Sequence, residues 1–288
     1  IMSDPCAVFA PDALKGKLAI ITGGGTGIGY SIAEAFLRHG AIVGIGSRRE
    51  EMVARAAETL SKDTGGRCLA FRLDVRDADA CASFVDNVVK AAGRPVDILV
   101  NCAAGNFLAA ASSLSPRAFR TVLDIDTTGT FLMSTAVFRK CWQEREVRAE
   151  DGINAPPAPA VIINISATLH VNGVPLQVHA GSAKAAIEGM TRHLACEWGK
   201  HGVRVVCVAP GPIRGTEGFS KLGGFMPEDV LRQYTAVIPL RRTGTREEIG
   251  AACLFLASGA AAYVTGTTLV VDGGNCLTGP EHFMWSKL

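Results

Sequence analysis

Glycines are concentrated in one short segment that directly follows an apolar run. Residues 22–29 read Thr-Gly-Gly-Gly-Thr-Gly-Ile-Gly; Leu18–Thr22 predicts a buried strand, and the residues up to about His39 predict a helix. Glycines let a backbone approach a phosphate closely, and the first N–H groups of a helix offer hydrogen bonds and positive potential. A purely structural turn is the alternative. We favour a pyrophosphate-binding loop, with contacts from Gly23, Thr26, Gly27, Ile28 and Gly29.

The end of the second predicted strand indicates which dinucleotide such a loop would hold. Ala41–Gly46 predicts a strand, and Ser47, Arg48 and Arg49 follow it. An NAD site usually carries an acidic residue about 20 residues beyond the glycine loop, for the ribose 2′-hydroxyl. This chain has cations there, and a guanidinium group can bind a 2′-phosphate through two hydrogen bonds. We therefore expect NADPH, with contacts from Ser47 and Arg48; Arg49 is the better candidate for a solvated turn residue.

Short apolar strands and helical patterns alternate along most of the chain. This alternation is typical of βαβ units, and strands without polar alternation indicate a parallel sheet covered on both faces. We therefore predict one α/β domain over residues 15–275. The predicted strands are Leu18–Thr22, Ala41–Gly46, Cys68–Leu73, Val96–Val100, Ala160–Ile165, Val203–Val208 and Thr267–Val271. Helices are predicted over Glu50–Leu60, Asp77–Ala91, Pro116–Cys141 with a break near Gly129, the stretch ending near Trp198, and Glu247–Ala257.

Four segments lie outside this regular pattern. Residues 1–14 form an N-terminal extension, the proline-rich residues 143–159 predict a surface loop, and the glycine-rich residues 211–227 predict a lid. Residues 276–288 form a C-terminal tail that ends Ser286-Lys287-Leu288. This tripeptide is an address read by the peroxisomal import receptor. We therefore expect the peroxisomal or glycosomal matrix as the location.

The composition excludes several classes of function. The chain has 29 basic and 27 acidic residues, a net charge of +2, and 48% hydrophobic residues. A nucleic-acid-binding protein would carry a larger basic excess. We find no apolar stretch long enough to predict a membrane-spanning helix. The nine cysteines contain no C-x-x-C pair, so we expect reduced thiols and no bound metal.

Several motifs together resemble the short-chain dehydrogenase/reductase family over about residues 15–275. They are the glycine loop, Leu73-Asp74-Val75, Asn101-Cys102-Ala103-Ala104-Gly105, and Pro210-Gly211-Pro212-Ile213 with Thr216 beyond it. The resemblance implies a Rossmann-type, doubly wound parallel sheet of seven strands, and a dimer or tetramer. It also implies that the nicotinamide cofactor contacts Asp74, Val75, Asn101, Ala103, Gly105, Ser166, Lys184, Pro210, Gly211, Ile213 and Thr216.

The chain departs from the pattern of family members that oxidise alcohols. Those members use Tyr-x-x-x-Lys with a serine and an asparagine. Lys184 matches the lysine, but the tyrosine position holds Ala180, the serine position Ala167 and the asparagine position Asp126. Without a phenol, transfer of a proton to a carbonyl group lacks its acid. Ordinary ketone reduction is therefore not expected, and the three tyrosines of the chain lie outside the motif.

These departures resemble those of the 2,4-dienoyl-CoA reductases, in particular the peroxisomal ones. The resemblance is carried by residues 101–107, 124–127, 177–184 and 211–218, and the terminal Ser-Lys-Leu agrees with it. It implies that NADPH reduces a 2,4-dienoyl-CoA thioester to a 3-enoyl-CoA in the β-oxidation of unsaturated fatty acids. Hydride would go to Cδ, negative charge would move to the thioester oxygen, and a proton would be added at Cα.

The same resemblance suggests roles for individual residues. Lys184 would orient the nicotinamide ribose, and Asp126 would supply the proton. A nearby Lys184 favours the ionised form of Asp126, so we expect a water molecule to relay the proton. Candidate substrate-binding residues, each with a structural alternative such as a core, capping or solvated position, are Arg76, Asn106, Phe107, Ser115 and Arg117.

Two other functions remain open at this point. One is an ordinary carbonyl reductase or hydroxyacyl dehydrogenase, against which Ala180 and Ala167 argue. The other is a protein that binds NADP without catalysis, against which the complete glycine loop and Lys184 argue.

Overall fold

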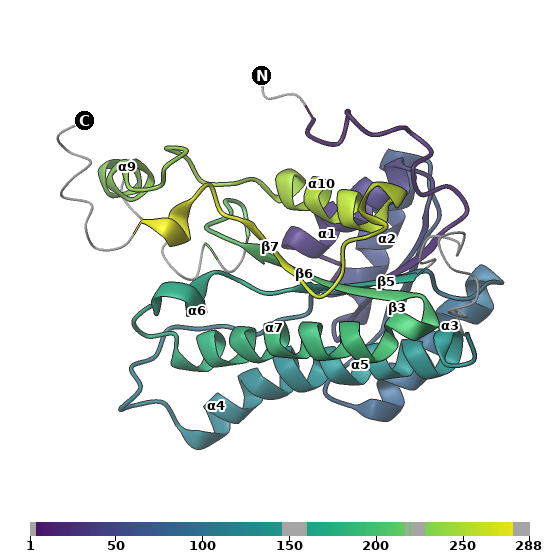
Figure 1. Cartoon of the computed structure of the whole chain (residues 1–288), viewed down its shortest axis with the longest axis horizontal. Coiled ribbons are helices and arrows are strands. Elements are labelled where there is room, and N and C mark those ends of the chain that lie inside the picture. Colours follow the sequence, from purple (N-terminus) through teal and green to yellow (C-terminus); the bar gives the residue numbers. More distant parts are fainter. Residues whose placement is uncertain (1–3, 146–159, 217–218, 220–227, 279–288) are drawn as a thin grey trace.

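The computed structural model describes residues 4–145, 160–216, 219 and 228–278. Seven parallel strands form one sheet in the order β3-β2-β1-β4-β5-β6-β7 (Figure 1). This confirms the predicted doubly wound α/β fold, and each strand ends within two residues of its expected bounds. The strands are β1 Leu18–Thr22, β2 Ile42–Ser47, β3 Cys68–Arg72, β4 Ile98–Asn101, β5 Ala160–Ile165, β6 Val203–Pro210 and β7 Thr268–Val271.

The two faces of the sheet are covered by different helices, because side chains alternate along each strand. In β1, Ala19 and Ile21 pack into a core with α1 and α10, whereas Leu18 and Ile20 pack into a second core with α3, α5 and α7. The helices are α1 Gly27–Arg38, α2 Glu50–Thr64, α3 Ala78–Ala92, α4 Pro116–Leu123, α5 Gly129–Val137, α6 Leu169–Asn172, α7 Val178–Trp198, α9 Glu228–Ala236 and α10 Arg246–Ala257. Helices thus cover both faces of the sheet. The ends of the strands are left for ligands.

The long helix predicted over Pro116–Cys141 is present but contains two π-helical turns. Asp124–Thr128 forms one between α4 and α5, and Phe138–Trp142 forms the other after α5. Gly129 does not break the helix: its φ of −61° is helical. A Cβ at this glycine would lie 2.7 Å from Val75, so the missing side chain allows the helix to pack closely. The α-helix is thus interrupted near Gly129, as predicted, but by the π-helical turn before it and not by the glycine.

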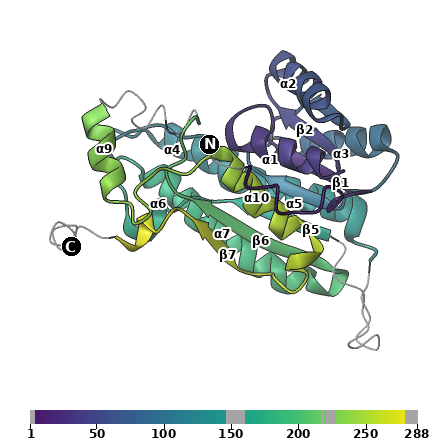
Figure 2. The same ribbon diagram turned by 90° about the horizontal axis from the view of Figure 1, so that it is seen from above.

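The region before Trp198 also differs from the single predicted helix. It contains the short helix α6 and the long helix α7, joined by a turn in which Leu176 has a positive φ of 66°. Helix α9 was not predicted; it lies at the end of the molecule away from α2 (Figure 2). Of the lid predicted over 211–227, only residues 211–216 and 219 are described. Most of the 143–159 loop and the terminal tripeptide likewise lie outside the described residues.

The N-terminal extension packs against the domain where it is described. Cys6 and Leu14 are buried in the core beside α1, and Phe9 meets the ring of His39 edge-on.

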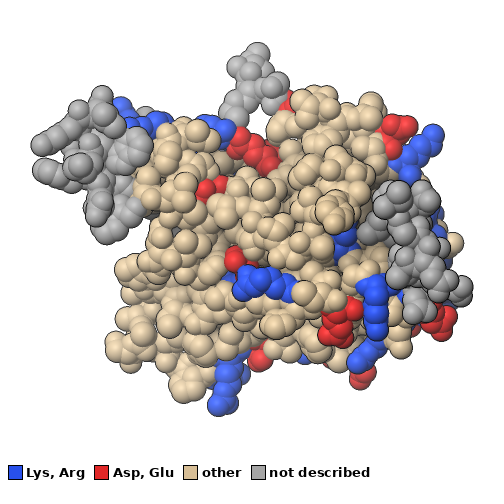
Figure 3. Space-filling model, in the orientation of Figure 1, with Lys and Arg blue, Asp and Glu red and all other residues tan. Residues whose placement is uncertain are grey.

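All nine cysteines are free thiols, as expected. None of the described helices has the length and apolarity needed to cross a membrane. On the face shown in Figure 3, acidic and basic side chains are interspersed.

Candidate active site

The glycine loop leaves the start of α1 open toward solvent. Gly23 and Gly27 have positive φ angles of 69° and 58°, and Thr26, the residue before α1, makes no capping hydrogen bond through its side chain. A Cβ at Gly29 would lie 2.5 Å from the carbonyl oxygen of Gly23, whereas one at Gly27 would meet nothing within 4 Å. Gly29 is therefore needed for internal packing, and Gly27 leaves space beside the helix N-terminus. This geometry fits the pyrophosphate of a dinucleotide.

The glycine loop is joined to the loop after β4 by one hydroxyl group. Thr22 Oγ1 accepts hydrogen bonds from the N–H groups of Cys102 and Ala103, both at 3.0 Å. The neighbouring Asn101 is buried, and its Nδ2 donates to Asn164 Oδ1 at 2.9 Å and to Ser134 at 3.0 Å. The side chain of Asn101 therefore lies between β5 and α5, buried away from the glycine loop.

Asp126 and Lys184 form a buried ion pair at the carboxyl ends of β4 and β5. Lys184 Nζ lies 3.0 Å from Asp126 Oδ2 and donates to the carbonyl oxygen of Ile165, also at 3.0 Å. The other carboxylate oxygen of Asp126 accepts the N–H of Gly105 at 2.7 Å. The side chain of Asp126 is 1% exposed and that of Lys184 10%. The π-helical turn Asp124–Thr128 thus places a carboxylate against the lysine of α7.

A second contact fixes the segment that follows Gly105. The Nε2 atom of His179 lies 2.9 Å from the carbonyl oxygen of Phe107, and the two rings stack with centroids 4.4 Å apart. His179 is fully buried. It therefore has a structural role: it holds the loop that carries Asn106, the residue after the Gly105 that is bound to Asp126. Phe107 remains 36% exposed, which leaves part of its ring available to an apolar ligand.

Two hydroxyl groups predicted at the site make local contacts. Ser166 Oγ donates to Glu188 Oε1 at 3.0 Å, and the same carboxylate oxygen lies 3.3 Å from His170 Nε2. Ser115 caps α4, since its Oγ accepts the N–H of Ala118 at 3.1 Å. The hydroxyl of Ser115 thus has the capping role that the sequence left open, and Arg117 lies exposed in the first turn of α4.

Three charged residues gather near the ends of β2 and β3. Arg76 donates to both carboxylate oxygens of Asp74, at 2.9 and 2.6 Å, and lowers the pKa of that carboxyl group to about 2. The positive charge of Arg48 lowers the same pKa further. Arg48 itself is exposed, directly after β2. Ser47 Oγ contacts the main chain of Arg49 at 3.3 Å, and Val75 is buried.

The remaining predicted cofactor contacts follow β6. A Cβ at Gly211 would lie 2.5 Å from that of Asp272, so only glycine allows the two segments to approach. The carbonyl oxygen of Pro210 accepts the N–H of Thr168 at 3.2 Å. Ile213 is buried, and the hydroxyl of Thr216 donates to its carbonyl oxygen at 2.9 Å. The side chains of Ile213 and Thr216 thus stabilise this loop.

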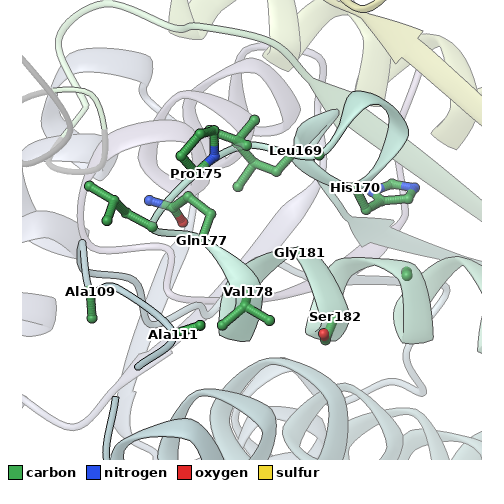
Figure 4. A pocket seen from close by; sticks show the side chains of 13 residues that line it. Ala109, Ala111, Leu169, His170, Pro175, Gln177, Val178, Gly181 and Ser182 are labelled. Atoms are coloured by element: carbon green, nitrogen blue, oxygen red, sulfur yellow. The ribbon is translucent and has the colours of Figure 1, made fainter. Parts of the chain in front are cut away.

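A cavity of about 640 Å³ opens beside the N-terminal half of α7 (Figure 4). Asp126 and Lys184 do not line it. Gly181 and Ala185, which flank Lys184 on α7, both line it. The lining residues are Ala109, Ala111, Leu169, His170, Gly173, Val174, Pro175, Leu176, Gln177, Val178, Gly181, Ser182 and Ala185.

Comparisons with known proteins agree with this geometry. The family model described as enoyl-(acyl carrier protein) reductase matches residues 23–275. The peroxisomal 2,4-dienoyl-CoA reductase of Pongo abelii is 50% identical over 95% of this chain and 88% of its own. That of Arabidopsis thaliana is 42% identical over 95% of this chain and 89% of its own. The chain belongs to the 2,4-dienoyl-CoA reductases of the short-chain dehydrogenase/reductase family.

Solved structures of this family share the fold. The citronellol catabolism dehydrogenase of Pseudomonas aeruginosa has a TM-score of 0.78 and 32% identity, over 93% of this chain and 98% of its own. A short-chain dehydrogenase from Bacillus anthracis has a TM-score of 0.74 and 34% identity, over 92% and 98%. The chain is thus an oxidoreductase of a family that binds a nicotinamide cofactor.

In this member of the family, the place of the phenol is filled by an apolar residue. Ala180 is 2% exposed and lies one turn before Lys184 on α7. The three tyrosines of the chain belong to other segments: Tyr30 lies in α1, Tyr234 in α9, and Tyr263 is fully exposed before β7. Beside Ala180, Asp126 and Lys184 form a buried ionisable pair.

One residue of the site was not singled out from the sequence. Gln177 precedes α7, is 2% exposed and lines the cavity. The available signal was its place directly before α7, seven residues before Lys184 along the chain.

Proposed function

We propose that this chain uses NADPH to reduce 2,4-dienoyl-CoA thioesters to 3-enoyl-CoA products in the peroxisome. The observation that carries the proposal is the buried Asp126–Lys184 ion pair beside Ala180. An alcohol–carbonyl reaction requires an acid at the carbonyl oxygen. This centre instead has a carboxylate, Asp126, that can hold a water molecule for protonation of a carbon atom. The names of the relatives, which specify (3E)-enoyl-CoA products, support the same reaction.

The cofactor-binding half of the site fits NADPH. The uncapped start of α1 and the open side of Gly27 would hold the pyrophosphate, and Arg48 would bind the 2′-phosphate. Lys184 has three N–H donors, of which two are used by Asp126 and Ile165. The third is available to a ribose hydroxyl group. When bound, NADPH supplies the hydride that is added at Cδ of the substrate.

The protein residues then govern where charge and proton go. Negative charge moves from Cδ through the conjugated chain to the thioester oxygen, and the ammonium group of Lys184 provides positive potential in a site shielded from water. Each carboxylate oxygen of Asp126 already accepts one hydrogen bond and has room for another. We propose that Asp126 holds a water molecule that delivers a proton to Cα, and that solvent returns a proton to the hydroxide left behind, so that each turnover consumes one proton. The product retains one double bond.

Location and assembly belong to the same proposal. We propose that Ser286-Lys287-Leu288 directs the chain to the peroxisomal matrix through the import receptor, which the peroxisomal names of the relatives support. We further propose a homodimer or homotetramer. Deleting the tripeptide should leave a fluorescent fusion in the cytosol. A measured solution mass equal to one chain would contradict the assembly.

The direct test is NADPH oxidation in the presence of 2,4-decadienoyl-CoA, with the double bond of the product located by NMR. Formation of the 3-enoyl-CoA supports the proposal; a 2-enoyl-CoA product, or no turnover by a protein that binds NADPH, would refute it.

Arg48→Gln tests the choice of cofactor. The variant should lose about 10-fold in affinity for NADPH, the effect of one charge-assisted contact, and none for NADH. Arg49→Gln is the matched control.

A further inference from the structure

Gln177 is a buried polar residue that the reaction described above does not use. It is 2% exposed, and neither its Nε2 nor its Oε1 has a hydrogen-bond partner among the described residues. Buried amide groups are nearly always paired, because an unpaired one forfeits its hydrogen bonds to water. The two unpaired atoms require a donor and an acceptor. The side chain therefore indicates a ligand that offers both.

The surroundings of Gln177 show where this ligand would lie. Gln177 lines the cavity beside α7, between Pro175 and Val178 as seen in Figure 4. Most of the lining is apolar. His170 lines the same cavity, and its Nδ1 atom is also buried without a partner in the described part of the chain. The cavity thus suits an elongated ligand with apolar stretches and a few polar groups.

The position of Gln177 on α7 relates this cavity to the reacting centre. Gln177 directly precedes α7, and Gly181, which lines the same cavity, is three residues before Lys184 on the helix, so the cavity borders the edge of α7 that carries Lys184. Seven residues correspond to about 10 Å along the axis. A substrate whose reacting carbons lie beside Lys184 therefore reaches Gln177 with a more distant part.

An acyl-CoA has two such parts, and their chemistry differs. The acyl chain beyond the diene is a hydrocarbon and cannot pair with an amide. The pantetheine arm beyond the thioester sulfur carries two secondary amides, each with one N–H donor and one carbonyl acceptor. This arm supplies both kinds of partner that Gln177 lacks.

We propose that Gln177 binds the pantetheine arm of the acyl-CoA, with Nε2 donating to an amide carbonyl oxygen and Oε1 accepting from an amide N–H. The inference rests on the proposed function, since it takes an acyl-CoA as the substrate. Gln177 does not meet the reacting atoms. It therefore acts on substrate affinity and on the choice of CoA thioesters over simple thioesters, and not on the chemical step.

The test compares two substrates in two variants. Gln177→Met keeps the length of the side chain and removes both hydrogen-bonding atoms. We expect its KM for 2,4-decadienoyl-CoA to rise about 10-fold, a factor that corresponds to 1.4 kcal/mol, with kcat within twofold. For the S-propyl thioester of the same acid, which has no amide, kcat/KM should equal that of the unaltered protein. Gln143→Met makes the same substitution at an exposed glutamine outside this cavity; it is the matched control and should change neither substrate's kinetics.

Two results would overturn the inference. One is an unchanged KM for the CoA substrate; the other is an equal loss for both thioesters, which would make Gln177 a residue that only shapes the cavity. If Gln177→Met fails to fold, Gln177→Asn, which shortens the amide, should show the same discrimination.

A binding measurement separates this inference from the proposed function. Calorimetry with hexanoyl-CoA, which cannot be reduced at a diene, should show about 10-fold weaker binding for Gln177→Met. Equal binding would reject the role of Gln177 even where dienoyl-CoA is turned over. Weaker binding without any dienoyl-CoA turnover would instead retain Gln177 and reject the reductase.

Discussion

Replacing Asp126 by asparagine tests the centre most directly. The substitution keeps the shape of a side chain that is 1% exposed, and its remaining oxygen can still accept the N–H of Gly105. It removes the negative charge 3.0 Å from Lys184 Nζ and points an amide N–H toward an ammonium group. Asp126→Asn should therefore preserve the fold while removing the carboxylate that holds the proton-donating water.

The structure sets the size of both effects. Breaking a buried ion pair typically costs about 3–5 kcal/mol. Since Lys184 keeps the carbonyl oxygen of Ile165, we expect the low end, about 3 kcal/mol, which a typical stability of about 5–15 kcal/mol can absorb. Acid–base catalysis contributes about 100- to 10,000-fold to rates. We expect kcat to fall by at least about 100-fold, which raises the barrier by about 2.7 kcal/mol.

The assay is NADPH oxidation with 2,4-decadienoyl-CoA, combined with fluorescence titration of NADPH. The dissociation constant of NADPH should stay within about threefold, because the glycine loop is untouched. Asp124→Asn is the matched control: Asp124 lies in the same π-helical turn but is exposed, and its variant should keep its kcat. A near-normal kcat for Asp126→Asn would remove Asp126 from the mechanism. An equal loss in both variants would show that charge near the turn, and not this carboxylate, is what matters.

Three other predictions concern the frame around this centre. Gly29→Ala should lower the melting temperature and abolish the thermal shift caused by NADPH, because its Cβ would lie 2.5 Å from a carbonyl oxygen of the loop; a normal shift would contradict the tight packing. Arg76→Met should raise the pKa of Asp74 from about 2 toward its ordinary value near 4, as followed by NMR titration of the carboxyl carbon. Since the folded pKa is the lower one, the pair stabilises the fold above about pH 4, and this contribution, below about 1 kcal/mol at the surface, should disappear as the pH falls toward about 2. At neutral pH iodoacetamide should label the exposed Cys196 well before Cys102, because burial raises the pKa of the Cys102 thiol to about 11; mass spectrometry showing the reverse order would refute this.

Much of the fold could be predicted from the sequence because the strands are short apolar runs with clear ends. β1 begins and ends where its pattern indicates, and the glycine loop follows it directly. The proximity of Asp126 to Lys184 followed from motif positions in a fold of known topology. These features depend on residue type and order along the chain.

Other features depend on contacts between distant segments and could not be predicted in this way. Glycine commonly weakens a helix. At Gly129, however, the missing side chain lets the helix pack closely against Val75, which is distant in sequence. The division between α6 and α7 includes a positive φ at Leu176, a conformation that leucine rarely favours. The unpaired amide of Gln177 becomes visible only when every neighbour is in place.

The π-helical turn Asp124–Thr128 has a consequence for how this centre could be altered. A π-helical turn holds one residue more than an α-helical one, so deleting a single residue there would allow regular α-helix to form. Each helical residue advances the side-chain direction by about 100°. Asp126 would then turn away from Lys184 while the seven strands kept their pairing. Deleting one codon would thus remove the catalytic carboxylate from the site and leave the sheet intact. Activity at this centre can therefore be lost in evolution without any change in the fold.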